Sequence, residues 1–447
     1  MSLLITLAAF ALAIGVLVSI HEYGHYWVAK RCGVKVLTFS IGFGKPLLTW
    51  QRGETQWQLA AIPLGGYVKM LDEREAPVAD HELHRAFNQQ TPLRRMAIVV
   101  AGPIANFLLA ILVYWGIFMT GVDITLPRLG TVVPGSVAAT AGLQAGDTIQ
   151  GIDGEQLDSW AEVQLALIDR AAARAQVALE VDRRGQRQTL VLDLSRLGNE
   201  AVDGRLTQHI GMLLGVLRVG EVREGSAAAL AGLQGDDQLL QVEGKPIAGP
   251  GAFVAAIQAR AGLPTRLEVL RGGQVRQLLV TPQAIVENGR TIGRIGAGVG
   301  MDIAALQSLQ QQKRYGPVEA AGRALKQTWA TSALSLRMMW RMLQGNVSVK
   351  QLSGPVAIAD YAGQSAKIGL RAYLEFLCLI SISLGVLNLL PVPVLDGGHL
   401  MYYSAELLRG RPVSERVMEL GQRVGVGLLA ALMVVALFND ITRLVGG

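Results

Sequence analysis

Two histidines four residues apart, His21 and His25, are the first residues in this sequence whose types and spacing could do chemistry. On a helix their imidazoles lie on one face and can hold a single zinc ion, with Glu22 beside them. A carboxylate in that position can act as a general base on water. Because the preceding run 3–18 is apolar enough for a bilayer, the pattern predicts metal-assisted hydrolysis inside a membrane.

A plainer interpretation is that these histidines are interfacial side chains at the end of an apolar helix. Five-residue patterns also occur by chance. Ionisable groups within a spanning segment are costly to bury, however, and for that reason they are usually functional. This cost favours the metal site.

A third ligand is expected in the segment 388–399, which reads NLLPVPVLDGGH. Pro391 and Pro393 interrupt the helix, and Asp396 follows as a carboxylate that needs a partner in lipid. Catalytic zinc sites usually have three protein ligands, so Asp396 would complete the set begun by the two histidines. His399 is a rival ligand, whose alternative role is hydrogen bonding around the site.

Composition indicates a membrane protein. Of the 447 residues, 51% are hydrophobic and 17% are charged, and the mean hydropathy is positive. The net charge of +6 is dispersed, with no basic tract among aromatics, so nucleic-acid binding is not expected. Cys32 and Cys378 are the only cysteines, which argues against a disulfide framework and a thiolate zinc site. Zinc would have nitrogen and oxygen ligands.

Four segments are long and apolar enough to cross a bilayer, at residues 3–27, 96–119, 374–395 and 420–438. We expect the first to be a retained anchor, because it lacks the basic start and the cleavage site of a signal peptide. Basic residues gather between the first and second spans and between the third and fourth, so these connections are predicted to be cytoplasmic. The stretch 121–373 would then be periplasmic, and both sets of ligands would lie at similar depth.

The segment 34–70, between the first two spans, predicts strands rather than a helix. It is β-rich, with turn signals at 42–46 and again near its end. Such an apolar hairpin could approach the zinc helix, and its edge could pair with an unwound substrate. An ordinary cytoplasmic β-loop is the alternative. The residues expected at the substrate edge are Gln58, Leu59, Gly65, Gly66 and Tyr67.

Polar residues also occur shortly before the second span and within it. His81 and His84 do not have the four-residue spacing of His21 and His25 and are expected on a solvated surface. The run 102–106, GPIAN, places small residues and the amide of Asn106 among aliphatics, so this face is expected to pack on the zinc helix. Whether Asn106 does more than pack is left open at this point.

The large middle part contains an internal repeat, since the pattern of residues 134–154 recurs 90 positions later at 224–244. Helical stretches follow near 160–172 and 253–261. The two copies resemble tandem PDZ domains, which bind extended chains beside a hydrophobic groove. A helix is predicted over 316–345, with Leu325, Trp329 and Trp340 on one face, either on a membrane surface or packed on the second repeat.

Taken together, HExxH in the first span, GPxxN in the second, the tandem repeats and NxxPxPxLDGG in the third resemble the site-2 protease family of intramembrane zinc metalloproteases. The resemblance covers essentially the whole chain. It implies a polytopic α-helical membrane protein with four transmembrane helices, a membrane-associated β-hairpin region and two periplasmic PDZ domains. It also implies zinc ligands at His21, His25 and Asp396, an acid/base at Glu22, and a substrate-holding asparagine at Asn388.

The expected segments are the first two spans with the β-loop (1–120), two PDZ domains (121–220 and 221–310), an amphipathic helical segment (311–372) and the last two spans (373–447). The resemblance implies single-span substrates, notably an anti-sigma factor already trimmed in the periplasm, and signal-peptide remnants. Other partners would be polypeptide ligands of the PDZ domains and the lipid bilayer of a bacterial inner membrane. A PDZ scaffold without catalysis leaves Glu22 unexplained, and a zinc transporter would need polar residues along several spans.

Overall fold

The structure is a computed structural model that describes residues 2–172, 176–195, 206–247, 249–287, 290–344 and 354–445. The chain divides into two compact units. We call residues 1–121 with 314–447 the helical unit, and residues 122–313 the β-rich unit.

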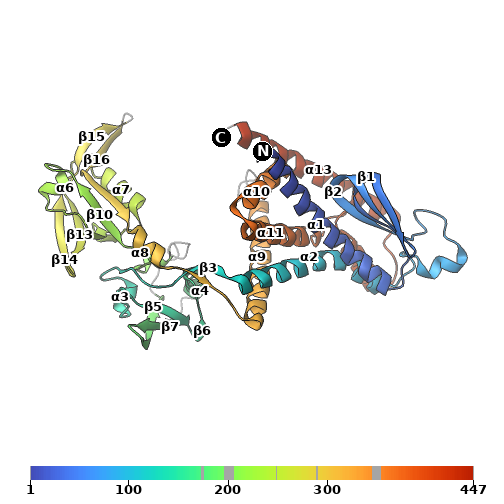
Figure 1. The fold of residues 1–447 in the computed structure, drawn as a ribbon, viewed down its shortest axis with the longest axis horizontal. Helices are drawn as coiled ribbons and strands as arrows, with labels where there is room; N and C mark the ends of the chain where they lie inside the picture. Colours follow the sequence, from blue (N-terminus) through green and yellow to red (C-terminus); the bar gives the residue numbers. More distant parts are fainter. Residues whose placement is uncertain are drawn as a thin grey trace. The chain divides into compact units, whose positions relative to one another are not determined.

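Within the described residues, four helices of the helical unit are long and apolar enough to cross a membrane. They are α1 (Ser2–Arg31), α2 (Pro92–Thr120), α11 (Leu370–Asn388) and α13 (Glu415–Val445) (Figure 1). The four spans predicted from hydropathy are therefore confirmed as helices, and the chain is a multi-pass membrane protein.

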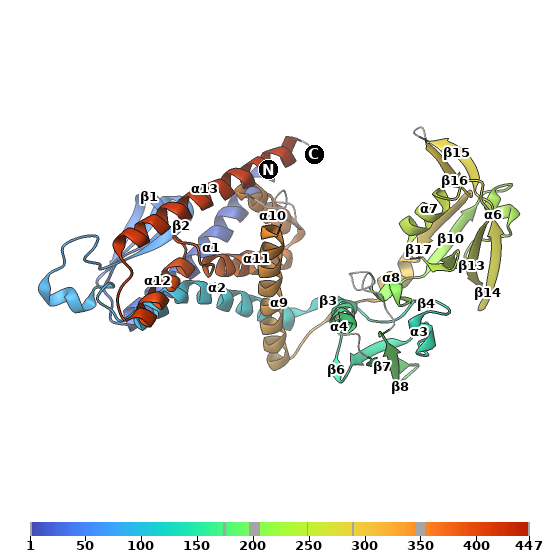
Figure 2. The same ribbon diagram turned by 180° about the vertical axis from the view of Figure 1, so that it is seen from behind.

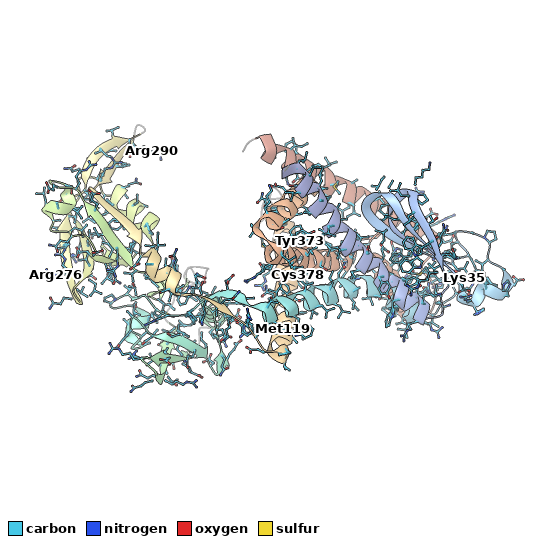
Figure 3. The ribbon with its side chains drawn as sticks, in the orientation of Figure 1. Lys35, Met119, Arg276, Arg290, Tyr373 and Cys378 are labelled. Carbon is cyan, nitrogen blue, oxygen red and sulfur yellow. The ribbon has the colours of Figure 1, made fainter. Side chains whose placement is uncertain are left out.

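Helix α11 packs against both α1 and α2. The hydroxyl of Tyr373 donates to the carbonyl of Ala9 on α1, at 2.7 Å. The thiol of Cys378 donates to the carbonyl of Ala110 on α2, at 3.6 Å. Both side chains project from α11 (Figure 3). In an apolar surrounding such side-chain bonds to backbone carbonyls add to close packing, and they fix α11 beside the helix that carries the histidines.

The third span is broken before its predicted end, as its prolines indicated. Helix α11 stops at Asn388 within the predicted span 374–395, and Asp396 begins a separate helix, α12 (Asp396–Arg409). Pro391 and Pro393 account for the break, since proline lacks the N–H that a helix needs and disfavours helical geometry in the residue before it. Asp396 is therefore the first residue of a helix that follows a non-helical linker.

The segment between the first two spans is a long antiparallel hairpin, as predicted. Strand β1 (Val36–Arg52) pairs with β2 (Thr55–Met70), and the first part of β1 is paired on both sides, with Phe39 opposite Val68 and also opposite Trp57. The end of β2, residues 66–70, is thus one edge of the sheet. The hairpin lies beside α1 in both views (Figures 1 and 2). His81 and His84 follow on a short 3-10 helix, η1 (Asp80–Arg85), which has no buried residue.

Two more helices complete the helical unit. Helix α9 (Pro317–Leu343) confirms the helix expected near 316–345, and it leaves Trp329 76% exposed and Trp340 61% exposed. Helix α10 (Pro355–Ile368) lies within the helical segment expected over 311–372, although no separate helix was predicted at its position. Its first turn is capped from α13, where the Asp440 carboxylate accepts hydrogen bonds from the backbone N–H groups of Gly354, Val356 and Ala357, at 3.0–3.1 Å.

The β-rich unit contains two similar halves, which bears out the internal repeat. The first half has β4 (Thr131–Val132), α3 (Val137–Thr140), β5 (Thr148–Ile152), β6 (Glu155–Gln156), α4 (Trp160–Ala172), β7 (Gln176–Arg183), β8 (Gln186–Asp193), α5 (Leu206–His209) and β9 (Met212–Leu213). The second has β10 (Leu217–Val222), α6 (Ala227–Leu230), β11 (Gln238–Val242), β12 (Lys245–Pro246), α7 (Pro250–Gln258), β13 (Thr265–Arg271), β14 (Gln274–Val280), β15 (Gln283–Glu287), β16 (Arg290–Arg294) and β17 (Ala297–Met301). Strand β3 (Val122–Thr125) pairs with β18 (Gln310–Lys313), which follows α8 (Ile303–Ser308).

The sheets of the two halves follow the same path. In the first half the strand order is β6-β5-β7-β8, and β4 pairs with β9. In the second half it is β14-β13-β11-β10-β17, with β12 beside β11 and a separate β15–β16 hairpin. Each half has its own apolar core, centred on Leu167 and Leu179 in the first and on Leu267 and Val269 in the second.

The repeat extends to matching polar contacts. Asp147 pairs with Arg183 in the first half at 2.7 Å, and Asp237 pairs with Arg271 in the second at 2.5 Å. Burial alone would raise the pKa of Asp237, but the hydrogen-bonded guanidinium of Arg271 and the N–H of Gln234 outweigh it and hold that pKa below its ordinary value. Each aspartate directly precedes a strand, β5 or β11, and its ion pair joins the start of that strand to the neighbouring strand, β7 or β13, which carries the arginine.

Candidate metal centre

Three side chains from two distant parts of the chain converge near the C-terminal end of α1. The Nε2 atoms of His21 and His25 are 3.2 Å apart, because the residues are one helical turn apart on the same face. The Oδ2 atom of Asp396, at the start of α12, lies 3.3 Å from His21 Nε2 and 3.5 Å from His25 Nε2. The two histidines are only 8% and 9% exposed.

This triangle has the dimensions of one face of a tetrahedral zinc site. With zinc–nitrogen bonds of about 2.0–2.1 Å, tetrahedral geometry separates neighbouring ligand atoms by roughly 3.3 Å. Oδ2 of Asp396 is buried, and within the described residues it has no hydrogen-bond partner. A bare buried carboxylate oxygen is costly unless a cation satisfies it. The residues therefore fit zinc, and among the described residues this is the one group of three such side chains close enough to share an ion.

Helix α2 packs against both imidazoles. His25 Nδ1 lies 2.8 Å from the carbonyl oxygen of Ile98, and His21 Nδ1 lies 3.2 Å from Nδ2 of Asn106. Between these contacts, a Cβ atom at Gly102 would lie 2.3 Å from His25 Nε2. The expectation that the face of residues 102–106 packs on the zinc helix is confirmed. The roles of Gly102 and Asn106 at the imidazoles were missed, although the GPxxN pattern was the signal for them.

Asn388 ends α11 beside the centre, with its Nδ2 3.5 Å from His21 Nε2. His399 lies elsewhere. It lines a neighbouring cavity of about 390 Å³ together with Asp72, Arg74 and Tyr403. Of the two candidate third ligands, the structure places Asp396 against the histidines and His399 outside the group of three.

Helix α12 is held in place by a buried ion pair. The guanidinium of Arg95, on α2, lies 2.6 Å from a carboxylate oxygen of Glu406 on α12 and covers the ring of Tyr403 at 4.7 Å. Arg95 is only 8% exposed, so the pair is shielded from water and from salt. This contact anchors the helix whose first residue is Asp396.

The edge of the β1–β2 sheet lies beside Glu22, the residue next to His21. A Cβ atom at Gly66 would lie 3.2 Å from Cγ of Glu22 and 2.9 Å from Cγ1 of Val18. The absence of a side chain at Gly66 is what lets the strand approach α1 this closely. Gly65 lies in turn against the ring of Phe43.

The other predicted edge residues lie further along the sheet. Nε2 of Gln58 donates to Oγ of Ser40 at 3.1 Å and to the hydroxyl of Tyr67 at 3.0 Å. Gln58 is 8% exposed, whereas Leu59 and Tyr67 are 41% and 36% exposed. The amide of Gln58 is thus engaged within the sheet, and it fixes Tyr67 beside the glycines at the edge.

Comparison with known proteins agrees with this geometry. The profile of peptidase family M50 matches residues 9–432 of the chain. The chain belongs to peptidase family M50. The resemblance to the site-2 proteases that the motifs predicted is confirmed, and the protein is a zinc metalloprotease.

Relatives of this M50 protease match it from end to end. A Neisseria meningitidis protein named as a zinc metalloprotease is 44% identical over 445 residues, which cover 99% of this chain and 100% of the relative. The regulator of sigma-E protease RseP of Escherichia coli K12 is 40% identical over 452 residues, with 99% and 100% coverage. The regulator of sigma E protease of Salmonella typhi is 42% identical over 453 residues, with the same coverage.

Proposed function

We propose that this M50 metalloprotease hydrolyses peptide bonds within the membrane-spanning segments of single-span membrane proteins. The observation that carries the proposal is the triangle of His21, His25 and Asp396, whose two histidines stand on a helix that is itself long and apolar enough to cross a bilayer. A zinc site on such a helix can meet a substrate helix without that substrate leaving the membrane.

In this proposal His21, His25 and Asp396 hold the zinc ion, and Glu22 is the acid/base. Bound zinc supplies a Lewis acid that lowers the pKa of water and polarises the scissile carbonyl. Glu22 takes the proton from the attacking water and returns it to the nitrogen that leaves. The low exposure of the two histidines keeps the centre apart from bulk water, where these charge interactions would be weaker.

A substrate helix must unwind before its carbonyls can be attacked, and we propose that the hairpin edge holds the extended form. Residues 66–70 are an edge of the β1–β2 sheet, and Gly66 lies beside Glu22. Backbone pairing with such an edge is a recurrent way of binding an extended peptide. Asn388, whose Nδ2 lies 3.5 Å from His21 Nε2, would hydrogen-bond to the extended substrate, with Gln58, Leu59, Gly65 and Tyr67 supporting the edge.

We also propose that the two repeats are PDZ domains that bind polypeptide. A groove of about 490 Å³ lies between α7 and β17, lined by Phe253, Val254 and Ile257 of the helix and by the segment 292–299. A groove between a helix and an exposed strand is where PDZ domains add a peptide strand. Domain limits at 121–220 and 221–310, with a periplasmic location, complete this part of the proposal.

The names of the relatives suggest the biological setting. Two of them are named as regulators of sigma-E, so we propose that this protease acts in an envelope-stress response. Its substrates would be an anti-sigma factor already trimmed on the periplasmic side and signal-peptide remnants. The active site would lie near the cytoplasmic face of a bacterial inner membrane, since basic residues gather in the connections on that side.

The test uses the full-length protein in proteoliposomes with a single-span reporter substrate. Wild-type protein should cleave the reporter within its span, lose that activity with a zinc chelator and regain it when zinc is added. Glu22→Gln should retain zinc and lose at least about 1000-fold in turnover, because the proton transfer is removed. Cleavage by Glu22→Gln at the wild-type rate, or cleavage only outside the span, would contradict the proposal.

A further inference from the structure

The side chain of Asn106 is completely buried beside the metal centre, and half of its amide lacks a partner. Its exposed fraction is 0%, and its Nδ2 lies 3.2 Å from Nδ1 of His21. Its Oδ1 is buried without a hydrogen-bond partner within the described residues. A buried amide oxygen that is left unpaired destabilises the fold, so this arrangement needs a physical reason.

The reason lies in which ring nitrogen of His21 carries the hydrogen. Its Nε2 faces His25 and Asp396, so a metal held there requires Nε2 to be free of hydrogen. The ring proton then sits on Nδ1, which must donate. An NH₂ group opposite that N–H would set donor against donor. Because amide oxygen and nitrogen are told apart only by their hydrogen bonds, turning the amide by half a rotation puts Oδ1 opposite Nδ1, where it accepts the ring N–H of His21 and removes the clash of two donors.

His25 has the matching arrangement. Its Nδ1 donates to the carbonyl oxygen of Ile98 at 2.8 Å, which leaves Nε2 for the centre. Ile98 and Asn106 lie two turns apart on α2, with Gly102 midway between them on the same face. One face of α2 therefore offers each imidazole an acceptor and leaves room for both rings between the acceptors.

We propose that Asn106 is a positioning residue whose amide oxygen accepts the Nδ1–H of His21 and so holds that imidazole with Nε2 toward zinc. The inference rests on the proposed zinc site and adds a role for the second span. Groups that orient a metal-binding histidine in this way typically contribute 10- to 100-fold to metal affinity.

Two substitutions separate acceptor chemistry from packing. Asn106→Asp keeps an acceptor opposite Nδ1 and has nearly the same shape, whereas Asn106→Leu keeps the branched shape with the same number of heavy atoms and removes the acceptor. Ser381→Ala is the matched control, because Oγ of Ser381 donates to the backbone carbonyl of Asn106 at 2.8 Å, is fully buried and contacts the same residue from α11.

The measurement is zinc affinity of the full-length, detergent-solubilised protein by competition with a chelator, together with thermal unfolding with and without zinc. Asn106→Leu should bind zinc about 10- to 100-fold more weakly. Asn106→Asp and Ser381→Ala should stay within about threefold of wild type, and the zinc-free proteins should unfold at similar temperatures.

The inference is overturned if Asn106→Leu binds zinc like wild type, or if Asn106→Asp loses as much affinity as Asn106→Leu while the zinc-free proteins remain equally stable. Should Asn106→Leu fail to fold, Asn106→Ala carries the same expectation of weakened binding against the same control. Failure of the zinc site itself has a different signature, since wild type and His21→Ala would then bind zinc equally poorly.

Discussion

Gly102 lies directly against His25, across the contact between the second and first spans. A Cβ atom at Gly102 would come within 2.3 Å of Nε2 of His25 and within 2.8 Å of Cε1 of His21, far inside van der Waals distance. Both rings occupy the space that a side chain would fill. The two imidazoles can occupy their positions in the membrane-embedded centre only because Gly102 on the neighbouring helix has no side chain.

The first prediction follows from that contact. In Gly102→Ala the new methyl must push the imidazoles away or force the helices apart, and displacing catalytic groups by about 1 Å can cost about 100-fold in rate. We expect zinc content and turnover both to fall, the latter by about 100-fold. Metal analysis and reporter cleavage on the same preparation measure this.

Gly116→Ala is the control for that substitution. It lies on the same helix, and a Cβ atom there has nothing within 4 Å. It should keep zinc and activity, and it should be slightly favourable for the helix because alanine has the better helical propensity. Full zinc occupancy and wild-type turnover in Gly102→Ala would show that the contact is unimportant.

A second prediction concerns the hairpin edge. A Cβ atom at Gly66 would lie 2.7 Å from the carbonyl oxygen of Ser40 and 3.2 Å from Cγ of Glu22. Gly66→Ala should therefore shift the edge relative to α1. Because none of the three metal-centre side chains is touched, zinc content should stay unchanged while turnover of a transmembrane reporter falls about 10-fold or more.

The hairpin turn provides the control for Gly66. Gly53 has φ of +62° and open space around its Cβ position, and asparagine tolerates this conformation well. Gly53→Asn should leave cleavage unchanged. If Gly66→Ala also cleaves at the wild-type rate, the hairpin edge plays no part in binding the substrate. If Gly66→Ala loses zinc, the hairpin instead supports the metal centre.

Much of this architecture is predictable because its signals are local. Apolar length alone predicts α1 and α2, alternation and turn residues predict the β1–β2 hairpin, and the recurring Gly-Asp pattern predicts the two halves of the β-rich unit. The pairing of His21 with His25 follows from helical spacing. Asp396 could be named because a carboxylate beside lipid needs a cationic partner.

The rest depends on contacts between residues far apart in the chain. No local signal says that Asn106 meets His21 or that Gly102 underlies His25. The start of α10 as a separate helix went unpredicted because its first turn is capped by Asp440, which lies more than 80 positions later in the sequence. The prolines predicted a break in the third span, but the exact end of α11 at Asn388 was not predicted, because the apolar run continues through Leu395 and hydropathy alone does not register where a helix ends.

The last prediction concerns the pH dependence of the second half of the β-rich unit. Asp237 is 1% exposed, and its paired carboxylate has a pKa below the ordinary value. A carboxyl group whose pKa is lowered by folding stabilises the fold at pH values above its unfolded pKa, about 3.9, and that contribution is lost as the pH falls through the folded value.

At pH 7, Asp237→Asn should lower local stability by about 2 kcal/mol, because it leaves Arg271 without its partner. Amide exchange over 238–242 in the full-length protein, read by mass spectrometry and corrected for intrinsic rates, should then be about 30-fold faster than in wild type. The difference should shrink as the pH falls below about 3.9, because the wild-type contribution is progressively lost between the unfolded pKa and the lower folded pKa. Asp236→Asn is the control, since Asp236 is the adjacent exposed residue with φ of +66° that asparagine accepts. A difference between Asp237→Asn and wild type that stayed constant from pH 7 to pH 3 would mean that packing or shape, and not the charge of Asp237, stabilises this half.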